Sequence, residues 1–201
     1  MRSEVKAFGP TALVTPANAL TMVRLIAAPL LAVLIVRSGP ASWLLWVSWT
    51  VLASSDGLDG HLARWHGTTR SGAFLDPLAD KFLVLGALAA LVDLHVFSVV
   101  PVVVIGVREV AMSAYRFYAG RRGLSIPARP AAKAKTVVQV CAIGLALLPP
   151  VEHSAPWAAR DVLWAAVALT VLTGAQYVRD GRRLLRSTPD GRTAVAHRTP
   201  V

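Results

Sequence analysis

The sequence is poor in cysteine and in charged residues. Its 201 residues include one cysteine, Cys141, and only 16% of them are Asp, Glu, Lys or Arg. A single cysteine cannot form an intrachain disulfide, and it excludes a zinc site built from several thiolates. So little charge, beside 55% hydrophobic residues, is far from the composition of soluble domains. The composition therefore predicts a membrane protein rather than a water-soluble one.

Acidic residues are especially scarce. The chain has 11 Asp and Glu against 21 Lys and Arg, which gives a formal net charge of +10. In a soluble chain such an excess would suggest nucleic acid, but beside long apolar runs it favours anionic lipid headgroups. We therefore expect membrane lipids, and no nucleic acid, among the partners.

Six apolar stretches approach the roughly 20 residues that a membrane-spanning helix needs. The second stretch is long enough only if its helix runs past Ser55, and after Asp93 we expect a tight turn rather than one long helix. The predicted fold is all-α and polytopic. Its six transmembrane helices are expected near residues 19–36, 41–55, 74–92, 96–118, 131–148 and 157–178.

The distribution of positive charge predicts the orientation in the membrane. Of the 21 basic residues, only Arg37 and Arg160 fall in loops assigned to the outer side. We therefore expect a protein of the cytoplasmic (inner) membrane with both termini in the cytoplasm. Residues 1–16 are expected to form an interfacial arm, because no cleavage site of the signal-peptide kind follows the first apolar run. Residues 1–180 are expected to form one membrane domain, and residues 181–201 a basic, disordered cytoplasmic tail.

Four of the few acidic residues cluster at the ends of two successive predicted spans. They lie within 25 residues of one another and are Asp56, Asp59, Asp76 and Asp80. An acid in a membrane helix is costly unless it is paired or lines a wet cavity, so these residues are functional candidates. Helical periodicity places the acids of each helix on one face together with small residues. A competing interpretation is that they form interfacial salt bridges with Arg64, Arg70 or Lys81.

Four carboxylates that meet between two helices favour metal binding. At 4 Å and an effective dielectric near 20, each pair would repel by about 4 kcal/mol. Two divalent cations cancel this charge, and oxygen ligands suit Mg²⁺ or Mn²⁺ better than Zn²⁺. Glycines beside the acids allow a ligand close to the backbone, and Arg64 offers a forked donor, as a diphosphate substrate requires. These glycines are Gly57, Gly60 and Gly72. The pattern indicates phosphoryl transfer at a two-metal site.

The order of these residues resembles the signature of the CDP-alcohol phosphotransferase family. The matching positions are Asp56, Asp59, Gly60, Ala63, Arg64, Gly72, Asp76 and Asp80. The resemblance implies six membrane helices around a cytoplasm-facing site, where metals hold the diphosphate of a CDP-linked lipid. It also implies that Asp80 is the general base that deprotonates the acceptor hydroxyl, with CMP as the leaving group. The residues expected to bind the CDP-lipid are Asp56, Gly57, Gly60, Ala63, Arg64 and Gly72.

A second resemblance concerns the acceptor. Residues 75–81, LDPLADK, are similar to the form of the motif found in phosphatidylglycerophosphate synthases and cardiolipin synthases of that family. Residues 16–24, and Arg108 and Glu109 together with residues 132–139, are similar to the former group. The resemblance implies an enzyme of phospholipid biosynthesis that transfers a phosphatidyl group from CDP-diacylglycerol to sn-glycerol 3-phosphate, giving phosphatidylglycerophosphate and CMP.

Three basic residues are candidates for binding the phosphate of the acceptor. Arg108 lies near the middle of the fourth predicted span, where it either holds a phosphate or pairs with Glu109 or an acid of the site. Lys133 and Lys135 begin the fifth span, where they either snorkel to lipid headgroups or bind glycerol 3-phosphate. An acceptor that is itself a dianion requires such a basic subsite.

Other functions stay open at this point. A cardiolipin synthase would use phosphatidylglycerol as acceptor, and inositol phosphate is disfavoured by the glycerol-type motif. A divalent-cation carrier would also have carboxylates in the membrane, but its acids should lie near the midplane, whereas these lie at one face. Acyl-chain preference and the formation of a homodimer also stay open.

Overall fold

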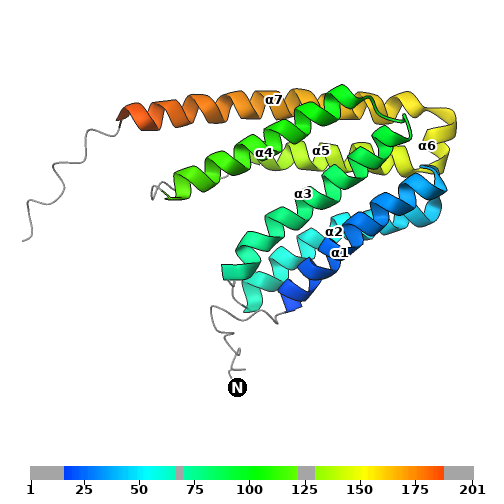
Figure 1. Cartoon of the computed structure of the whole chain (residues 1–201), viewed down its shortest axis with the longest axis horizontal. Helices are drawn as coiled ribbons and strands as arrows, with labels where there is room; N and C mark the ends of the chain where they lie inside the picture. The colour runs from blue at the N-terminus through cyan, green and yellow to red at the C-terminus, as the bar shows by residue number, and fades with distance from the viewer. Residues whose placement is uncertain (1–15, 67–69, 122–129, 188–201) are drawn as a thin grey trace, which may run out of the picture.

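A computed structural model shows an all-helical protein (Figure 1). The structure describes residues 16–66, 70–121 and 130–187, and the side chains of residues 21–55, 78–115, 117–118, 134–176 and 179. Within these ranges it contains seven helices and no strand. The helices are α1 (Pro16–Ser38), α2 (Trp43–His66), α3 (Arg70–Asp93), α4 (Val99–Arg121), α5 (Pro130–Leu147), α6 (Pro149–Ser154) and α7 (Pro156–Ser187).

Each of the six long helices overlaps one of the six predicted apolar stretches, so the all-α prediction is confirmed. α2 continues past Ser55 to His66, as a full crossing requires. A turn follows Asp93, as expected, and its residue His95 has a positive φ of 59°. The short helix α6 is not among the predicted stretches, because six residues are too few to give a periodic pattern.

Prolines and one glycine define several helix ends. α1, α5, α6 and α7 each begin with a proline, where the missing backbone N–H has no intrahelical partner to lose. α1 ends at Ser38, directly before Gly39 with φ 78°, a backbone conformation that glycine adopts without strain. The chain can therefore turn sharply into α2.

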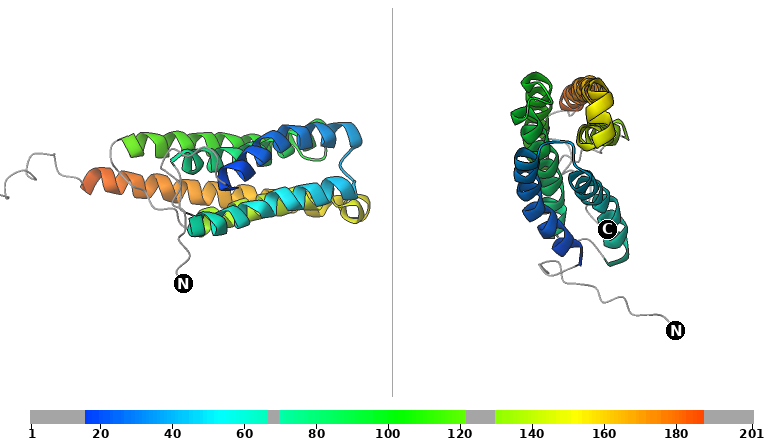
Figure 2. Two further views of the ribbon diagram at one scale, coloured as in Figure 1. Left: turned by 90° about the horizontal axis from the view of Figure 1, so that it is seen from below. Right: turned by 90° about the vertical axis from the view of Figure 1, so that its right-hand side faces the viewer.

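The long helices form two layers (Figure 2). One layer contains α1, α3 and α4, and the other contains α2, α5 and α7. Contacts of α1 with α2, of α3 with α5 and of α4 with α7 join the layers. The two turns after α1 and α3 lie with α6 at one end of the bundle, on the right of Figure 1, while α2 ends and α3 begins at the other end.

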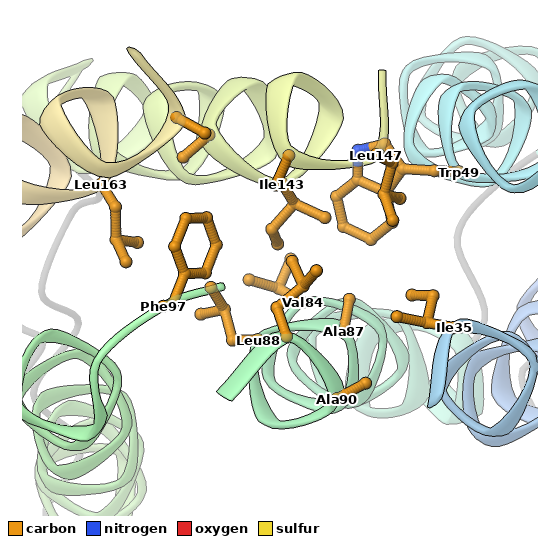
Figure 3. Close-up of a cluster of buried hydrophobic side chains, with 14 of the residues drawn as sticks. Ile35, Trp49, Val84, Ala87, Leu88, Ala90, Phe97, Ile143, Leu147 and Leu163 are labelled. Atoms are coloured by element: carbon orange, nitrogen blue, oxygen red, sulfur yellow. The ribbon is translucent and has the colours of Figure 1, made fainter. Parts of the chain in front are cut away.

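A cluster of buried apolar side chains lies between the layers (Figure 3). Trp49 of α2 is 1% exposed, and its indole N–H donates to the Val140 carbonyl of α5 over 3.2 Å. Gly144, one turn later on α5, lies beside this ring, where an added Cβ would make an ordinary contact at 3.6 Å. The cluster also contains Ile35, Leu88, Phe97, Ile143 and Leu163. It fixes α3 and α5 relative to one another, and both helices carry predicted site residues.

Large apolar side chains cover the outside of the bundle. Ile26, Leu44 and Val107, for example, are 70%, 73% and 64% exposed. An outer surface of this kind is typical of contact with lipid. Two helical segments in the described part of the chain are long and apolar enough to cross a membrane, Thr21–Ser38 in α1 and Pro156–Gln176 in α7. Two shorter apolar segments are Trp43–Ser55 and Ala134–Leu147.

α7 extends beyond the expected end of the membrane domain. It continues to Ser187, so the boundary expected after residue 180 falls inside a helix and residues 181–187 are helical rather than disordered. Five of these seven residues are Arg or Leu, which have high helix propensity. The rest of the expected tail, residues 188–201, and residues 1–15 of the expected N-terminal arm lie outside the described residues.

Candidate active site

The acidic motif lies on two consecutive helices that run in opposite directions (Figure 1). Asp56 and Asp59 belong to the second half of α2, and Asp76 and Asp80 to the first half of α3. At 1.5 Å per residue, Asp56 lies about 15 Å before the end of α2 and Asp80 about 15 Å after the start of α3. The corresponding distances are about 10 Å for Asp59 and about 9 Å for Asp76. Each acid of α2 thus has a counterpart on α3 at a similar distance along the helix from the connection between the two helices.

Asp80 is the member of the motif whose side chain the structure describes. The side chains of the other predicted metal and CDP-lipid residues lie outside the described part, as does that of Lys133. These residues are Asp56, Gly57, Asp59, Gly60, Ala63, Arg64, Gly72 and Asp76. Their assignment therefore stays a prediction, supported by the placement of the backbone.

A buried arginine of α1 holds Asp80. Arg24 donates from Nη1 to Oδ1 of Asp80 over 2.7 Å and from Nη2 to Oγ of Ser55 over 2.9 Å. The Arg24 side chain is 1% exposed, whereas that of Asp80 is 33% exposed. Hydrogen bonds between ionised groups are stronger and more directional than neutral ones. One buried cation therefore joins α1, α2 and α3 at the level of the predicted base.

A pocket of about 180 Å³ lies beside Asp80 and is lined by α3, α4 and α5. Its lining is unusually rich in polar side chains for a bundle with an apolar exterior. The lining residues are Asp80, Lys81, Val84, Leu85, Arg108, Glu109, Ser113, Lys135, Thr136 and Gln139. A cavity of this size and polarity fits a small charged molecule better than an acyl chain.

Glu109 of α4 connects two of the bases in the pocket. Its Oε1 accepts a hydrogen bond from Nη1 of Arg108 over 2.9 Å and another from Nζ of Lys135. Lys135 is only 4% exposed, so it lies inside the bundle and does not snorkel to headgroups. The structural pair considered for Arg108 therefore exists, and both bases also line the pocket, where a bound anion would meet them.

Lys81 is fixed on the wall that α3 contributes. Its Nζ bonds to Oγ of Ser113 on α4, and this hydroxyl donates to the Glu109 carbonyl over 2.6 Å. A hydroxyl that gives its proton to the backbone presents its lone pairs to an ammonium group. The cation that follows Asp80 in the chain is thus oriented by a neighbouring helix.

Two threonines of α7 do not line the pocket themselves but form hydrogen bonds with residues that do. Nη2 of Arg108 donates to Oγ1 of Thr173, and Nε2 of Gln139 donates to Oγ1 of Thr170, each over 3.3 Å. Thr170 is fully buried and Thr173 is 6% exposed. Both hydroxyls are therefore used inside the protein rather than at its surface.

Sequence reasoning found part of this site. Asp80, Arg108 and Lys135, which the sequence singles out, line one pocket, and their roles there stay a prediction. The site predicted from the sequence does not include Arg24, Ser113, Gln139, Thr170 or Thr173. Arg24 carries a usable signal, because a cation within an apolar stretch requires an acidic partner. The threonines carry none, since hydroxyl residues occur throughout membrane helices.

The donor set fits a hard divalent cation. The four acids supply only oxygen, the ligand type that Mg²⁺ and Mn²⁺ prefer, and they lie on two consecutive helices. The described side chains contain no group of three potential metal ligands. Of the four motif acids, only Asp80 has a side chain within the described part.

Comparisons with known proteins find relatives that are named as enzymes of one kind. A "Probable phosphatidylglycerophosphate synthase" of Mycobacterium tuberculosis is 41% identical over 167 residues, which are 81% of this chain and 79% of that protein. Proteins named CDP-diacylglycerol–glycerol-3-phosphate 3-phosphatidyltransferase from Cereibacter sphaeroides and Bacillus subtilis are each 34% identical. Those matches cover 78% and 69% of this chain and 74% and 73% of the two relatives.

The family profile for CDP-alcohol phosphatidyltransferase matches residues 14–172. Members of this family are membrane-bound enzymes that generally use a divalent metal. The expectation of an enzyme is therefore confirmed, and the alternative of a cation carrier is not supported. Because the profile covers most of the sequence, the chain belongs to the CDP-alcohol phosphatidyltransferase family.

Proposed function

We propose that this enzyme transfers the phosphatidyl group of CDP-diacylglycerol to sn-glycerol 3-phosphate, giving phosphatidylglycerophosphate and CMP. The observation that carries this proposal is the gathering of Lys81, Arg108 and Lys135 around one pocket beside Asp80. The names of the relatives from M. tuberculosis, C. sphaeroides and B. subtilis support the same reaction.

The charges around the pocket favour a dianionic acceptor. The described side chains at the site include four cations and two acids, so positive charge is in excess by two. They are Arg24, Lys81, Arg108 and Lys135 against Asp80 and Glu109. A phosphate monoester, which is mostly a dianion near pH 7, balances this excess. Phosphatidylglycerol carries one diester charge and two acyl chains, so it suits a small cationic pocket less well.

We assign two Mg²⁺ or Mn²⁺ ions to the motif acids, and the CDP-lipid to the small residues between them. The acids are Asp56, Asp59, Asp76 and Asp80, and the residues beside the lipid diphosphate are Gly57, Gly60, Ala63, Arg64 and Gly72. When bound, such ions neutralise the diphosphate and make its phosphorus a better electrophile. Arg64 supplies a bidentate donor to the same group.

The chain's own residues then position the acceptor and move one proton. Arg108 and Lys135, with Lys133 nearby in sequence, hold the phosphate of glycerol 3-phosphate. Asp80 takes the proton of the primary hydroxyl of glycerol 3-phosphate while the oxygen of that hydroxyl bonds to the phosphatidyl phosphorus. The bond from this phosphorus to the bridging oxygen breaks, and CMP leaves with that oxygen. Arg24 keeps the Asp80 carboxylate in place during this transfer.

We also propose that all six long helices cross the membrane, with the site and both termini on the cytoplasmic side. α1 to α4 contain 23, 24, 24 and 23 residues. At 1.5 Å per residue, each is about 35 Å long, which exceeds a hydrocarbon core of about 30 Å. The bias of the basic residues supports the orientation.

Release of CMP by the purified protein in detergent tests the proposal. With CDP-diacylglycerol and Mg²⁺, CMP should form when glycerol 3-phosphate is added, but not with glycerol, which lacks the phosphate. Chelation of the metal should stop the reaction. Release with phosphatidylglycerol in place of glycerol 3-phosphate would contradict the proposal and indicate a cardiolipin synthase, and release with inositol phosphate would contradict it as well.

A further inference from the structure

α7 contributes no residue to the lining of the pocket among the described side chains, yet it contacts two residues that do line it. These contacts come from Thr170 and Thr173, which lie three residues apart and hence on one face of the helix. Both are buried, although most of the helix around them is apolar. Two buried hydroxyls of α7 thus contact residues that line a charged pocket.

Thr173 is arranged as a hydrogen-bond acceptor for Arg108. Its hydroxyl donates to the Leu169 carbonyl on its own helix over 2.7 Å, and the Thr170 carbonyl lies 3.2 Å away. A hydroxyl has one proton, so this backbone contact leaves its lone pairs for another donor. Nη2 of Arg108 takes that position at 3.3 Å.

The Arg108 guanidinium is therefore anchored through both terminal nitrogens. Nη1 donates to Glu109 on its own helix, and Nη2 donates to Thr173 on α7. Its aliphatic stem passes Gly174, where an added Cβ would lie 3.8 Å from Cγ of the arginine. Because a guanidinium is planar, two anchors at different nitrogens fix the direction of the whole group.

Thr170 also accepts a hydrogen bond from a residue of the pocket, Gln139, which is 2% exposed. Nε2 of Gln139 donates to Oγ1 of Thr170 over 3.3 Å. An amide whose nitrogen is bound on one side turns its carbonyl oxygen to the other side. That orientation leaves an acceptor suited to a hydroxyl group of a glycerol-type substrate.

We propose that Thr173 and Thr170 are positioning residues for the acceptor: Thr173 orients Arg108 toward its phosphate, and Thr170 orients Gln139 toward a hydroxyl. This inference rests on the proposed function, in which Arg108 binds the acceptor phosphate. A purely structural role would instead consist of holding α4 and α5 against α7. The two roles differ in what they do to each substrate, because only positioning affects glycerol 3-phosphate selectively.

Steady-state kinetics of Thr173→Val and Thr173→Ser tests the inference. Valine keeps the shape and removes the hydroxyl, so the KM for glycerol 3-phosphate should rise roughly tenfold while that for CDP-diacylglycerol stays within about twofold. Serine keeps the hydroxyl and should restore the acceptor KM to within about twofold of the wild type. Thr170→Val should raise the same KM by roughly threefold, since its partner is a neutral amide.

Two control variants accompany these. Thr50→Val also removes a hydroxyl that bonds to its own helix, at the Trp46 carbonyl over 2.8 Å, but Thr50 is exposed on α2. Gly174→Ala adds a methyl group beside the stem of Arg108 at an ordinary contact distance. Neither should change the acceptor KM by more than about twofold, because neither removes a partner of the pocket.

The outcomes separate the inference from the proposed function. An unchanged acceptor KM in Thr173→Val, together with a raised one in Arg108→Ala, would overturn the inference and leave the function intact. Equal losses in both substrates, without rescue by serine, would also overturn it and indicate a structural role. Thr173→Cys, whose thiol accepts hydrogen bonds weakly, gives the same test if the valine variant does not fold. A wild-type enzyme that does not use glycerol 3-phosphate would instead refute the function itself.

Discussion

Replacement of Arg24 tests how the site is held together. This arginine donates to Asp80 over 2.7 Å and to Ser55 over 2.9 Å, and it is almost completely buried. Arg24→Met keeps the length of the side chain but removes the charge and every donor. Arg24→Lys keeps the charge but loses the fork that reaches two acceptors at once. We expect turnover to fall in both variants, and further in the methionine variant.

The size of the fall in turnover can be worked out from the hydrogen bond between Arg24 and Asp80. A hydrogen bond to a charged group contributes about 1.5–3 kcal/mol, and about 1.4 kcal/mol corresponds to a factor of ten in rate. If the contact between Arg24 and Asp80 is fully used in the transition state, kcat falls roughly 10- to 150-fold in Arg24→Met. Stability should fall too, by up to about 3 kcal/mol, because Asp80 is partly exposed and can regain water.

The assay is CMP release at saturating substrates, with thermal unfolding of each variant measured in the same detergent. Arg37→Met is the matched control: Arg37 lies in the last turn of α1, is exposed, and forms no ion pair within the part of the chain that the structure describes. It should keep kcat within about twofold, as surface substitutions usually do. A folded Arg24→Met protein with turnover within threefold of the wild type would refute the positioning of Asp80 by Arg24.

Three further predictions follow from the same geometry. Asp80→Asn should lower kcat by roughly 100-fold or more while CDP-diacylglycerol still binds, because general-base catalysis is lost and three of the four motif acids stay; equal losses of binding and rate would make Asp80 a metal ligand only. Lys135→Ala should raise the KM for glycerol 3-phosphate by roughly tenfold and leave that for CDP-diacylglycerol nearly unchanged, and an unaltered acceptor KM would remove Lys135 from the subsite. Trp49→Ala should lower the free energy of unfolding by about 3–5 kcal/mol, because it empties a core position and removes the bond to Val140; a melting temperature equal to that of the wild type would show that the core tolerates this loss.

Much of the fold could be predicted because apolar length is a strong signal in a membrane protein. The six long helices follow from stretches of about 20 apolar residues. The turn after Asp93 follows from two polar residues that interrupt a long run, and His95 adopts there the left-handed backbone that a tight turn requires. α6 has too few residues for a pattern. The helical end at residues 181–187 depends on helix propensity, which is a weaker signal than the basic charge of this segment.

A residue of the site could be predicted from the sequence only where its charge is energetically unfavourable in an apolar stretch. Asp80 and Arg108 stand out because a charged side chain in an apolar stretch requires a partner or a function. Their partners depend on which helices meet in space, so the link from Arg24 on α1 to Asp80 on α3 follows from packing rather than from spacing. Thr173 lies 65 residues from Arg108 and has no unusual neighbours in sequence, so only the structure reveals its contact.

Transfer of label from glycerol 3-phosphate into lipid tests the central claim most directly. Purified enzyme is incubated with CDP-diacylglycerol, Mg²⁺ and glycerol 3-phosphate carrying ¹⁴C, and both labelled lipid and CMP are counted over time. The account predicts one labelled phosphatidylglycerophosphate for each CMP released, in wild type and at a lower rate in Arg24→Met. Release of CMP without labelled lipid would mean that water or another alcohol accepts the phosphatidyl group, and it would contradict the account.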